Sequence, residues 1–236
     1  MSKAEVPARY LALAGELNEL IERCELTPHS LLPSERELAE RHHVSRMTAR
    51  KAVSLLESEG KVYRRPPRGT FVAEPRVAFR VGSFSREVHD QGHFPSARLL
   101  SAREIEPSPS VRGALKLKPG EPAYHIRRLR LLDDEPFAIE STYYPASRTP
   151  GLLDDLPEGS LWDLLAQRYG IVPKHSRARL SVVSVEERTA RELSLRPGTA
   201  GILQERRTVD GSGRAIEFAR DLYRADRAAF TVEEDF

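Results

Sequence analysis

Apolar residues recur with helical spacing in two segments near the start of the chain. In residues 7–23 they form one stripe, made of Tyr10, Leu13, Leu17, Leu20 and Ile21. In residues 45–59 they fall at positions i, i+3, i+4 and i+7, as Ala49, Ala52, Val53 and Leu56. A stripe of this width is typical of a helix that packs one face against a core. The pattern therefore predicts two amphipathic helices that pack together.

A shorter helix is predicted between these two, because capping residues mark its start. Ser34 is followed three residues later by Glu37, which is the spacing of a capping box. Ser45 can cap the next helix, and Gly60 can end it. Two helices joined by so short a corner form a helix-turn-helix.

The outward side of the second helix of this pair is predicted to be cationic, with Arg46, Thr48, Arg50 and Lys51 on it. A helix that is apolar behind and cationic in front suits the major groove of DNA. The alternative is an ordinary solvated face, but such a face usually mixes both signs of charge. We therefore interpret this helix as a DNA-reading element.

The next segment is predicted to form a small hairpin. Residues 62–65 and 70–73 are β-prone, and Pro66, Pro67, Arg68 and Gly69 form the tip between them. Arg64, Arg65 and Arg68 make this hairpin positive. A cationic hairpin beside a reading helix can lie along a phosphate backbone or enter a minor groove.

The distribution of charge supports this interpretation more than its total does. The 236 residues are 39% hydrophobic and 31% charged, with a net charge of +2, and are enough for two domains. Residues 36–70 hold nine Lys or Arg against four Asp or Glu, whereas residues 74–236 hold 25 of each. The positive charge is thus concentrated on the helix and hairpin. The low total disfavours a nucleic-acid packaging protein.

An internal repeat organises the second part of the chain. One copy begins at Val111 and the other at Glu187, and each has a short helix, a Pro-Gly step and two strands. The matched positions are Leu115 and Leu117 with Leu193 and Leu195, Pro119-Gly120 with Pro197-Gly198, and Ile139-Glu140 with Ile216-Glu217. Residues 160–169 add a helix, and residues 177–185 add a strand. The repeat predicts an α+β domain with an antiparallel sheet and pseudo-two-fold symmetry.

The first part of the chain resembles a known family. Residues 32–60, LPSERELAERHHVSRMTARKAVSLLESEG, followed by RGTFV, are similar to the winged helix-turn-helix of GntR-type bacterial transcription regulators. The resemblance implies that double-stranded DNA is contacted by Arg36, Ser45, Arg46, Thr48 and Arg50, with Arg68 and Gly69 at the wing tip.

The second part resembles the UTRA effector-binding domain of the HutC subfamily of these regulators. The resemblance rests on RLRLLDDEPFAIESTYYP at residues 128–145 and on AIEFARDLYRADR at residues 215–227. It implies the chorismate-lyase fold, an antiparallel sheet with helices, and dimerisation through this domain. We therefore expect a DNA-binding domain at 1–73, a linker at 74–80, and an effector-binding and dimerisation domain at 81–236.

The repeat also suggests where a ligand binds. Arg128 and Arg130 lie two apart on a predicted strand and so point to one face, while the two copies contribute Glu140 and Glu217. Arginines form paired hydrogen bonds with carboxylate or phosphate, so we expect a pocket for a small anionic metabolite. The alternative is that Arg128, Arg130 and Glu140 form only a cross-strand ladder of ion pairs.

The subfamily includes sensors of phosphorylated amino sugars, and resemblance to them implies a set of ligand-contacting positions. These are Ser83, Phe84, Ser85, Arg128, Arg130, Glu140, Ser160, Glu217 and Tyr223. Trp162 stands where those sensors carry Tyr, and we include it in the expected site.

Together these features predict a repressor that binds a palindromic operator as a homodimer, responds to a small anionic metabolite and is cytoplasmic. No cofactor or metal is expected, and no apolar run is long enough to span a membrane. The alternative is a lyase-like enzyme with an accessory DNA-binding head, because the implied fold is that of chorismate lyase. No catalytic motif or recognisable acid–base pair supports an enzyme.

Overall fold

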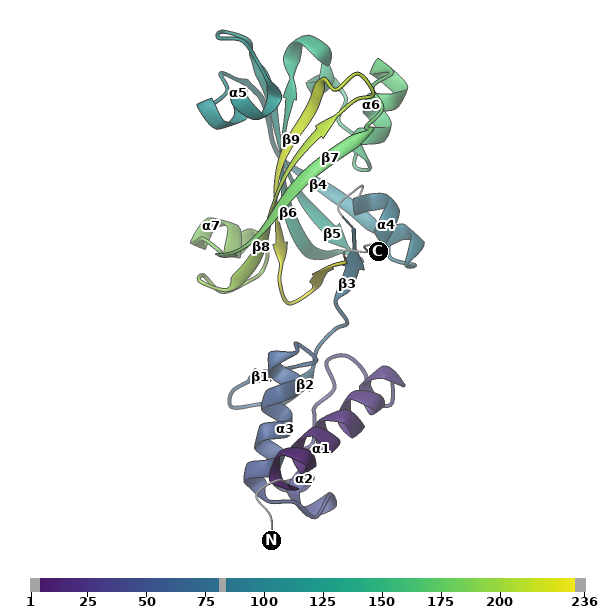
Figure 1. Cartoon of the computed structure of the whole chain (residues 1–236), viewed down its shortest axis with the longest axis vertical. Coiled ribbons are helices and arrows are strands. Elements are labelled where there is room, and N and C mark those ends of the chain that lie inside the picture. Colours follow the sequence, from purple (N-terminus) through teal and green to yellow (C-terminus); the bar gives the residue numbers. More distant parts are fainter. Residues whose placement is uncertain (1–4, 81–83, 232–236) are drawn as a thin grey trace. The chain divides into compact units, whose positions relative to one another are not determined.

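The computed structural model of the chain describes residues 5–80 and 84–231 (Figure 1). The chain forms two compact units that divide between Arg76 and Val77. Among the described helices, none combines the length and apolar character that crossing a membrane requires.

The first unit contains three helices and a two-stranded hairpin. In chain order these are α1 (Glu5–Glu22), α2 (Glu35–Arg41), α3 (Arg46–Ser58), β1 (Val62–Arg65) and β2 (Gly69–Val72). Its core consists of the two predicted apolar stripes packed together: Leu13, Ala14 and Leu17 of α1 against Ala49, Ala52, Val53 and Leu56 of α3. The winged helix-turn-helix is therefore confirmed.

Side-chain caps begin the two helices of the helix-turn-helix, as expected. The Ser34 backbone N–H donates to Glu37 Oε2 at 2.8 Å, and the Glu37 N–H donates to Ser34 Oγ at 3.2 Å. The bond from the Ser34 N–H, and next a bond from the Ser34 hydroxyl to the same oxygen, lower the pKa of the Glu37 carboxyl. The Thr48 N–H donates to Ser45 Oγ at 3.1 Å. Each cap satisfies backbone N–H groups that have no partner within the helix.

The second unit is built on a large antiparallel sheet. Its elements are β3 (Val77–Phe79), α4 (Phe84–Asp90), β4 (Pro95–Ile105), α5 (Pro109–Leu115), β5 (Ala123–Leu132), β6 (Glu135–Pro145), α6 (Leu161–Tyr169), β7 (His175–Ser184), α7 (Glu187–Glu192), β8 (Ala200–Val209), β9 (Ala215–Arg224) and β10 (Ala228–Phe230). Two short 3₁₀ helices, Ala146–Arg148 and Leu152–Asp154, lie between β6 and α6.

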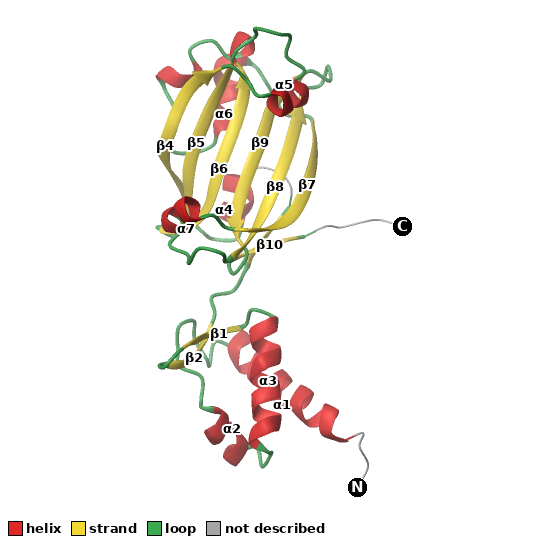
Figure 2. Cartoon of the chain, turned by 90° about the vertical axis from the view of Figure 1, so that its left-hand side faces the viewer, coloured by secondary structure: helices red, strands yellow, loops and turns green. Residues whose placement is uncertain are grey.

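The order of strands in the six-stranded sheet is β4-β5-β6-β9-β8-β7. Each half therefore runs strand, helix, strand, strand, and the two halves meet where β6 pairs with β9. Helices α5 and α7 lie on one face of the sheet, and α4 and α6 lie on the other (Figures 1 and 2). The predicted repeat and its pseudo-two-fold arrangement of strands are thus present in the fold.

Three strands were not predicted, and each has a physical reason. β4 is an edge strand with few buried residues, so its sequence lacks a clear apolar alternation. β3 and β10 have only three residues each and pair with one another in parallel across about 150 residues of sequence. β3 lies within residues 74–80, the range that was expected to be a linker.

Candidate nucleic-acid interface and ligand pocket

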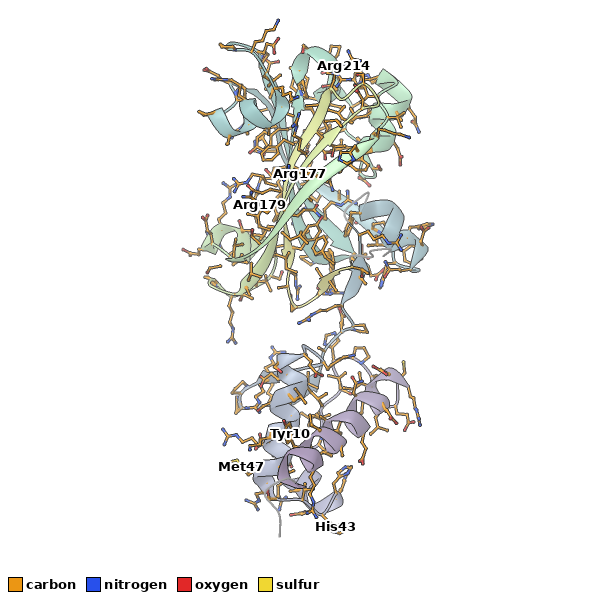
Figure 3. All side chains as sticks on the ribbon, viewed as in Figure 1. Tyr10, His43, Met47, Arg177, Arg179 and Arg214 are labelled. Carbon is orange, nitrogen blue, oxygen red and sulfur yellow. The ribbon has the colours of Figure 1, made fainter. Side chains whose placement is uncertain are left out.

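The exposed side of α3 carries the predicted cations. Arg46 and Arg50 are exposed, as are Arg36 on α2 and Arg68 at the hairpin tip. None of these four lies within ion-pair distance of a carboxylate among the residues that the structure describes. Met47, which follows Arg46 at the start of α3, is 60% exposed (Figure 3). Such a surface presents positive charge that the protein itself does not neutralise.

Thr48 differs from its expected position on the exposed face. It is only 8% exposed, and its Oγ1 lies 2.8 Å from Ser45 Oγ. The reason is its position three residues after the N-cap, which brings the threonine hydroxyl against the capping serine. The structure thus shows Thr48 supporting the start of α3 from the buried side.

The hairpin has the predicted tip, but one of its arginines is engaged within the protein. β1 and β2 pair antiparallel from Val62 with Val72 to Arg65 with Gly69. Gly69 has φ +121°, and a Cβ there would lie 2.8 Å from Leu31 Cδ1, so only glycine fits without displacement. Arg64 is paired with Glu35 at 3.4 Å and with Glu57 at 3.2 Å. Arg64 therefore fastens the hairpin to α2 and α3.

In the second unit, a pocket opens on the face of the sheet that α4 and α6 cover. Its cavity volume is about 30 Å³. It is lined by Phe84, Arg128, Arg130, Glu140, Tyr144, Ser160, Leu161, Trp162, Arg206, Glu217, Asp221 and Tyr223. Eight of the ten expected ligand-contacting residues are in this set. Ser83 lies outside the described residues, and the side chain of Ser85 is not described.

One ion pair of the pocket joins the strands β5 and β6. Arg128 Nε donates to Glu140 Oε2 at 2.5 Å, and the two residues are direct cross-strand partners. Arg128 Nη1 also donates to the carbonyls of Pro157 and Gly159, at 3.1 and 2.9 Å, in the loop before α6. Burial works against the charge of Arg128, but Glu140 outweighs it and raises the arginine pKa. The ladder expected as an alternative thus exists, and it forms part of the pocket wall.

A second ion pair occupies the matching place in the other half of the sheet. Arg206 Nη2 donates to Glu217 Oε1 at 2.9 Å, and its guanidinium lies 4.9 Å from the centre of the Trp162 ring. The other carboxylate oxygen of Glu217 accepts from Tyr144 Oη at 2.9 Å and from Trp162 Nε1 at 2.8 Å. Glu217 is therefore surrounded by donors from three different elements.

Sequence reasoning missed Arg206, Asp221 and Tyr144. Arg206 could have been found from the repeat, because the offset of 78 residues that joins Leu115 to Leu193 also joins Arg128 to Arg206. Tyr144 and Asp221 had no comparable signal. Their side chains become partners of the site only when β6 and β9 pair at the centre of the sheet.

Arg130 is the third buried cation of the pocket. It is 3% exposed, its guanidinium carbon lies 4.9 Å from the centre of the Phe84 ring, and its Nη1 lies 3.5 Å from the Gly159 carbonyl. Burial lowers its pKa, while Glu140 opposes that effect. Buried guanidiniums next to polar acceptors suit a ligand that carries both a negative charge and hydroxyl groups.

Two further features of the pocket concern metal ligands and the cap of α6. Among the described residues, no group of three His, Cys, Asp or Glu side chains could hold a metal ion. Ser160 Oγ accepts the Asp163 N–H at 3.2 Å and so caps α6, and its position in the pocket is compatible with a ligand contact.

Comparison with known proteins agrees with both units. Residues 9–72 match "Bacterial regulatory proteins, gntR family", and residues 90–229 match the UTRA domain. The repressor NagR of Bacillus subtilis is 32% identical over 94% of this chain and 92% of its own. The mannosyl-D-glycerate transport/metabolism system repressor MngR of Escherichia coli is 26% identical over 94% of each.

Solved structures show the same two-unit architecture. The crystal structure of PhnF from Mycobacterium smegmatis superposes with a TM-score of 0.69 at 29% identity, covering 94% of this chain and 99% of that one. These relatives are transcriptional regulators, so the alternative of a lyase-like enzyme is not supported. The chain belongs to the GntR family of bacterial regulatory proteins and is a DNA-binding transcriptional regulator with a UTRA effector-binding domain.

Proposed function

We propose that this protein is a repressor that binds a palindromic operator as a homodimer, and that a small anionic metabolite controls its affinity for the operator. A phosphorylated sugar is one candidate for the metabolite. The observation that carries the proposal is the separation of two cationic sites. One is an exposed set of arginines on α2, α3 and the hairpin tip, and the other is a buried set of three arginines in the pocket.

The exposed set supports DNA binding by α3. One recognition helix reads only a few base pairs, so two copies on half-sites about one helical turn apart would supply the needed affinity and specificity. In this arrangement Arg46 and Arg50 contact bases or phosphates in the major groove, and Arg68 contacts the backbone from the hairpin tip. Two copies joined through their second units would present the two helices to the two half-sites.

The buried set supports an anionic effector. Arg128, Arg130 and Arg206 are each less than 7% exposed and line one pocket, and guanidinium groups form paired hydrogen bonds with carboxylate or phosphate. An effector controls DNA binding only if it binds more tightly to one arrangement of the dimer than to another. We propose that the metabolite favours an arrangement that does not fit the operator, so its binding lowers operator affinity.

DNA binding is tested with an operator selected from random duplexes and with gel-shift titrations over salt concentration. Arg46→Ala or Arg50→Ala should weaken operator binding by about 1–3 kcal/mol, which is roughly 5–150-fold. Arg23→Ala is the matched control, because Arg23 is an exposed arginine just after the end of α1 that pairs with Glu19. If both α3 variants bind as tightly as the control, α3 is not the reading helix.

Effector binding is tested by thermal-shift screening of anionic metabolites, because a ligand that binds the folded state raises its melting temperature. The shift caused by a true effector should disappear in Arg130→Ala and persist in Arg98→Ala, an exposed arginine of β4 outside the pocket. A shift that survives Arg130→Ala places the effector elsewhere. Light scattering of the full chain tests the homodimer.

A further inference from the structure

Asp221 is a buried carboxyl group at the centre of the sheet. It lies on β9, is 3% exposed and lines the pocket. The paired positions of β6 and β9 are interrupted here, between Ile139 with Leu222 and Thr142 with Ala219. Across this gap, the Ser141 backbone N–H donates to Asp221 Oδ1 at 3.3 Å. Asp221 Oδ1 thus accepts a hydrogen bond from the sheet backbone, and Oδ2 faces Arg206 in the pocket.

The charge of Asp221 is the least well compensated of the three carboxylates in the pocket. Its ion-pair contact, from Oδ2 to Arg206 Nη2, is 3.9 Å long, whereas Glu140 and Glu217 lie 2.5 and 2.9 Å from their guanidinium partners. Moreover, Arg206 Nη2 is the nitrogen that already donates to Glu217. A buried carboxylate with so long a contact gains less than its desolvation costs.

Charged and titratable groups surround Asp221 in the pocket, from each strand that contributes to it. They are Arg128 and Arg130 of β5, Glu140 and Tyr144 of β6, Arg206 of β8, and Glu217 and Tyr223 of β9. Burial raises the pKa of Asp221 to about 7, with Arg206 lowering it and the neighbouring Glu140 and Glu217 raising it further. At neutral pH the carboxyl group is therefore poised between its two protonation states.

A dianion entering this pocket adds negative charge beside Asp221. The added charge favours the protonated carboxyl group, so anion binding and proton binding assist each other. A protonated carboxyl group also gains an O–H donor, which can bond to an oxygen of the ligand.

We infer that Asp221 contacts the effector and takes up one proton from solvent when a dianionic oxyanion binds, so that its O–H donates a hydrogen bond to the anion. The inference rests on the proposed anion pocket and assigns to it a residue and a pH dependence. The anion then meets a donor in place of a repelling carboxylate, and no change in the three arginines is needed.

The chain carries its own probe for this site, because Trp162 is its only tryptophan. The indole N–H donates to Glu217, and the ring lies beneath the Arg206 guanidinium. Trp162 fluorescence therefore reports on the pocket and not on anions bound by exposed arginines elsewhere. Sulfate is a suitable ligand, since it stays a dianion across neutral pH and any pH dependence then belongs to the protein.

The test is a sulfate titration of the full chain at constant ionic strength, between about pH 6 and about pH 8.5. Wild-type affinity should be constant at the acid end and fall by up to about tenfold per pH unit above neutrality. Asp221→Asn keeps an oxygen for the Ser141 N–H but cannot ionise, so its affinity should stay nearly constant with pH. Asp226→Asn, an exposed carboxyl paired with Arg224, is the matched control and should behave as wild type.

Calorimetry of the wild-type chain gives a second measurement that needs no variant. Above neutral pH, sulfate binding should take up about one proton, seen as a difference in heat between two buffers of unlike ionisation enthalpy. Equal heats in the two buffers, or a pH slope that persists in Asp221→Asn, would overturn the inference alone. Absence of any sulfate response at all pH values would overturn the anion pocket as well.

Discussion

Substitution of Glu217 should destabilise the second unit strongly, because this buried carboxylate accepts hydrogen bonds from three elements of the unit. Its carboxylate is 2% exposed and accepts from Arg206, Tyr144 and Trp162 at 2.8–2.9 Å. Glu217→Gln keeps the shape of the side chain, but replaces one acceptor oxygen with an amide NH₂ donor. That donor must face either Arg206 on one side or the Tyr144 and Trp162 donors on the other, so the substitution always brings two donors together.

The cost follows from the burial of the pair. Removing one partner of a buried ion pair leaves the other charge uncompensated, which typically costs about 3–5 kcal/mol. Arg206 would keep its bond to the neutral Gln204 Oε1 at 3.3 Å and its 3.9 Å contact with Asp221, and these offset little of the lost carboxylate charge. For a unit of this size, we expect the melting temperature to fall by roughly 6–20 °C.

Unfolding of the full chain by denaturant, followed through Trp162 fluorescence, isolates the second unit, since that unit holds the only tryptophan. Glu187→Gln is the matched control, because its pair with Arg191 is exposed and should matter by less than about 0.5 kcal/mol. Adding Arg206→Met to Glu217→Gln removes the guanidinium charge that has lost its carboxylate partner. The double variant should recover at least half of the lost free energy of unfolding. A Glu217→Gln unfolding free energy within about 1 kcal/mol of wild type would refute the reasoning.

Three further predictions concern other parts of the chain. Ser34→Ala removes the reciprocal cap of α2 and should destabilise the first unit by about 1 kcal/mol. Circular dichroism during thermal unfolding measures this loss, and an unchanged stability would mean that water replaces the cap. Leu56→Ala opens a cavity in the core between α1 and α3 and should lower the free energy of unfolding by about 2–5 kcal/mol in the same measurement. A smaller loss would show that the core collapses into the cavity. Because the Asp221 pKa is raised to about 7, the folded state binds its proton more tightly than the unfolded chain does, so this contribution to stability is full at acid pH and is lost as the pH rises towards 7. The free energy of unfolding in urea should therefore decline less steeply with rising pH in Asp221→Asn than in wild type. Equal declines in the two proteins would contradict the prediction.

The sequence alone was enough to identify the helices, the caps, the hairpin and the internal repeat. Each of these depends on residues close together in the chain, such as Ser34 with Glu37 or Ala49 with Leu56. The repeat also pointed to Arg128, Arg130, Glu140 and Glu217 as one group, because strands of like sequence form like positions in a symmetric sheet.

Only the tertiary structure decided which polar side chains are free to meet a ligand. Arg64 was expected to contribute charge to a cationic wing, but it pairs with Glu35 of α2 and Glu57 of α3. Thr48 was expected to be exposed, but it is buried against its own cap. Such outcomes depend on contacts between distant segments, which local patterns do not record. The same holds for Asp221, whose carboxyl group lies near the arginine that also pairs with Glu217. These contacts form only when β6, β9 and β8 lie side by side in the sheet.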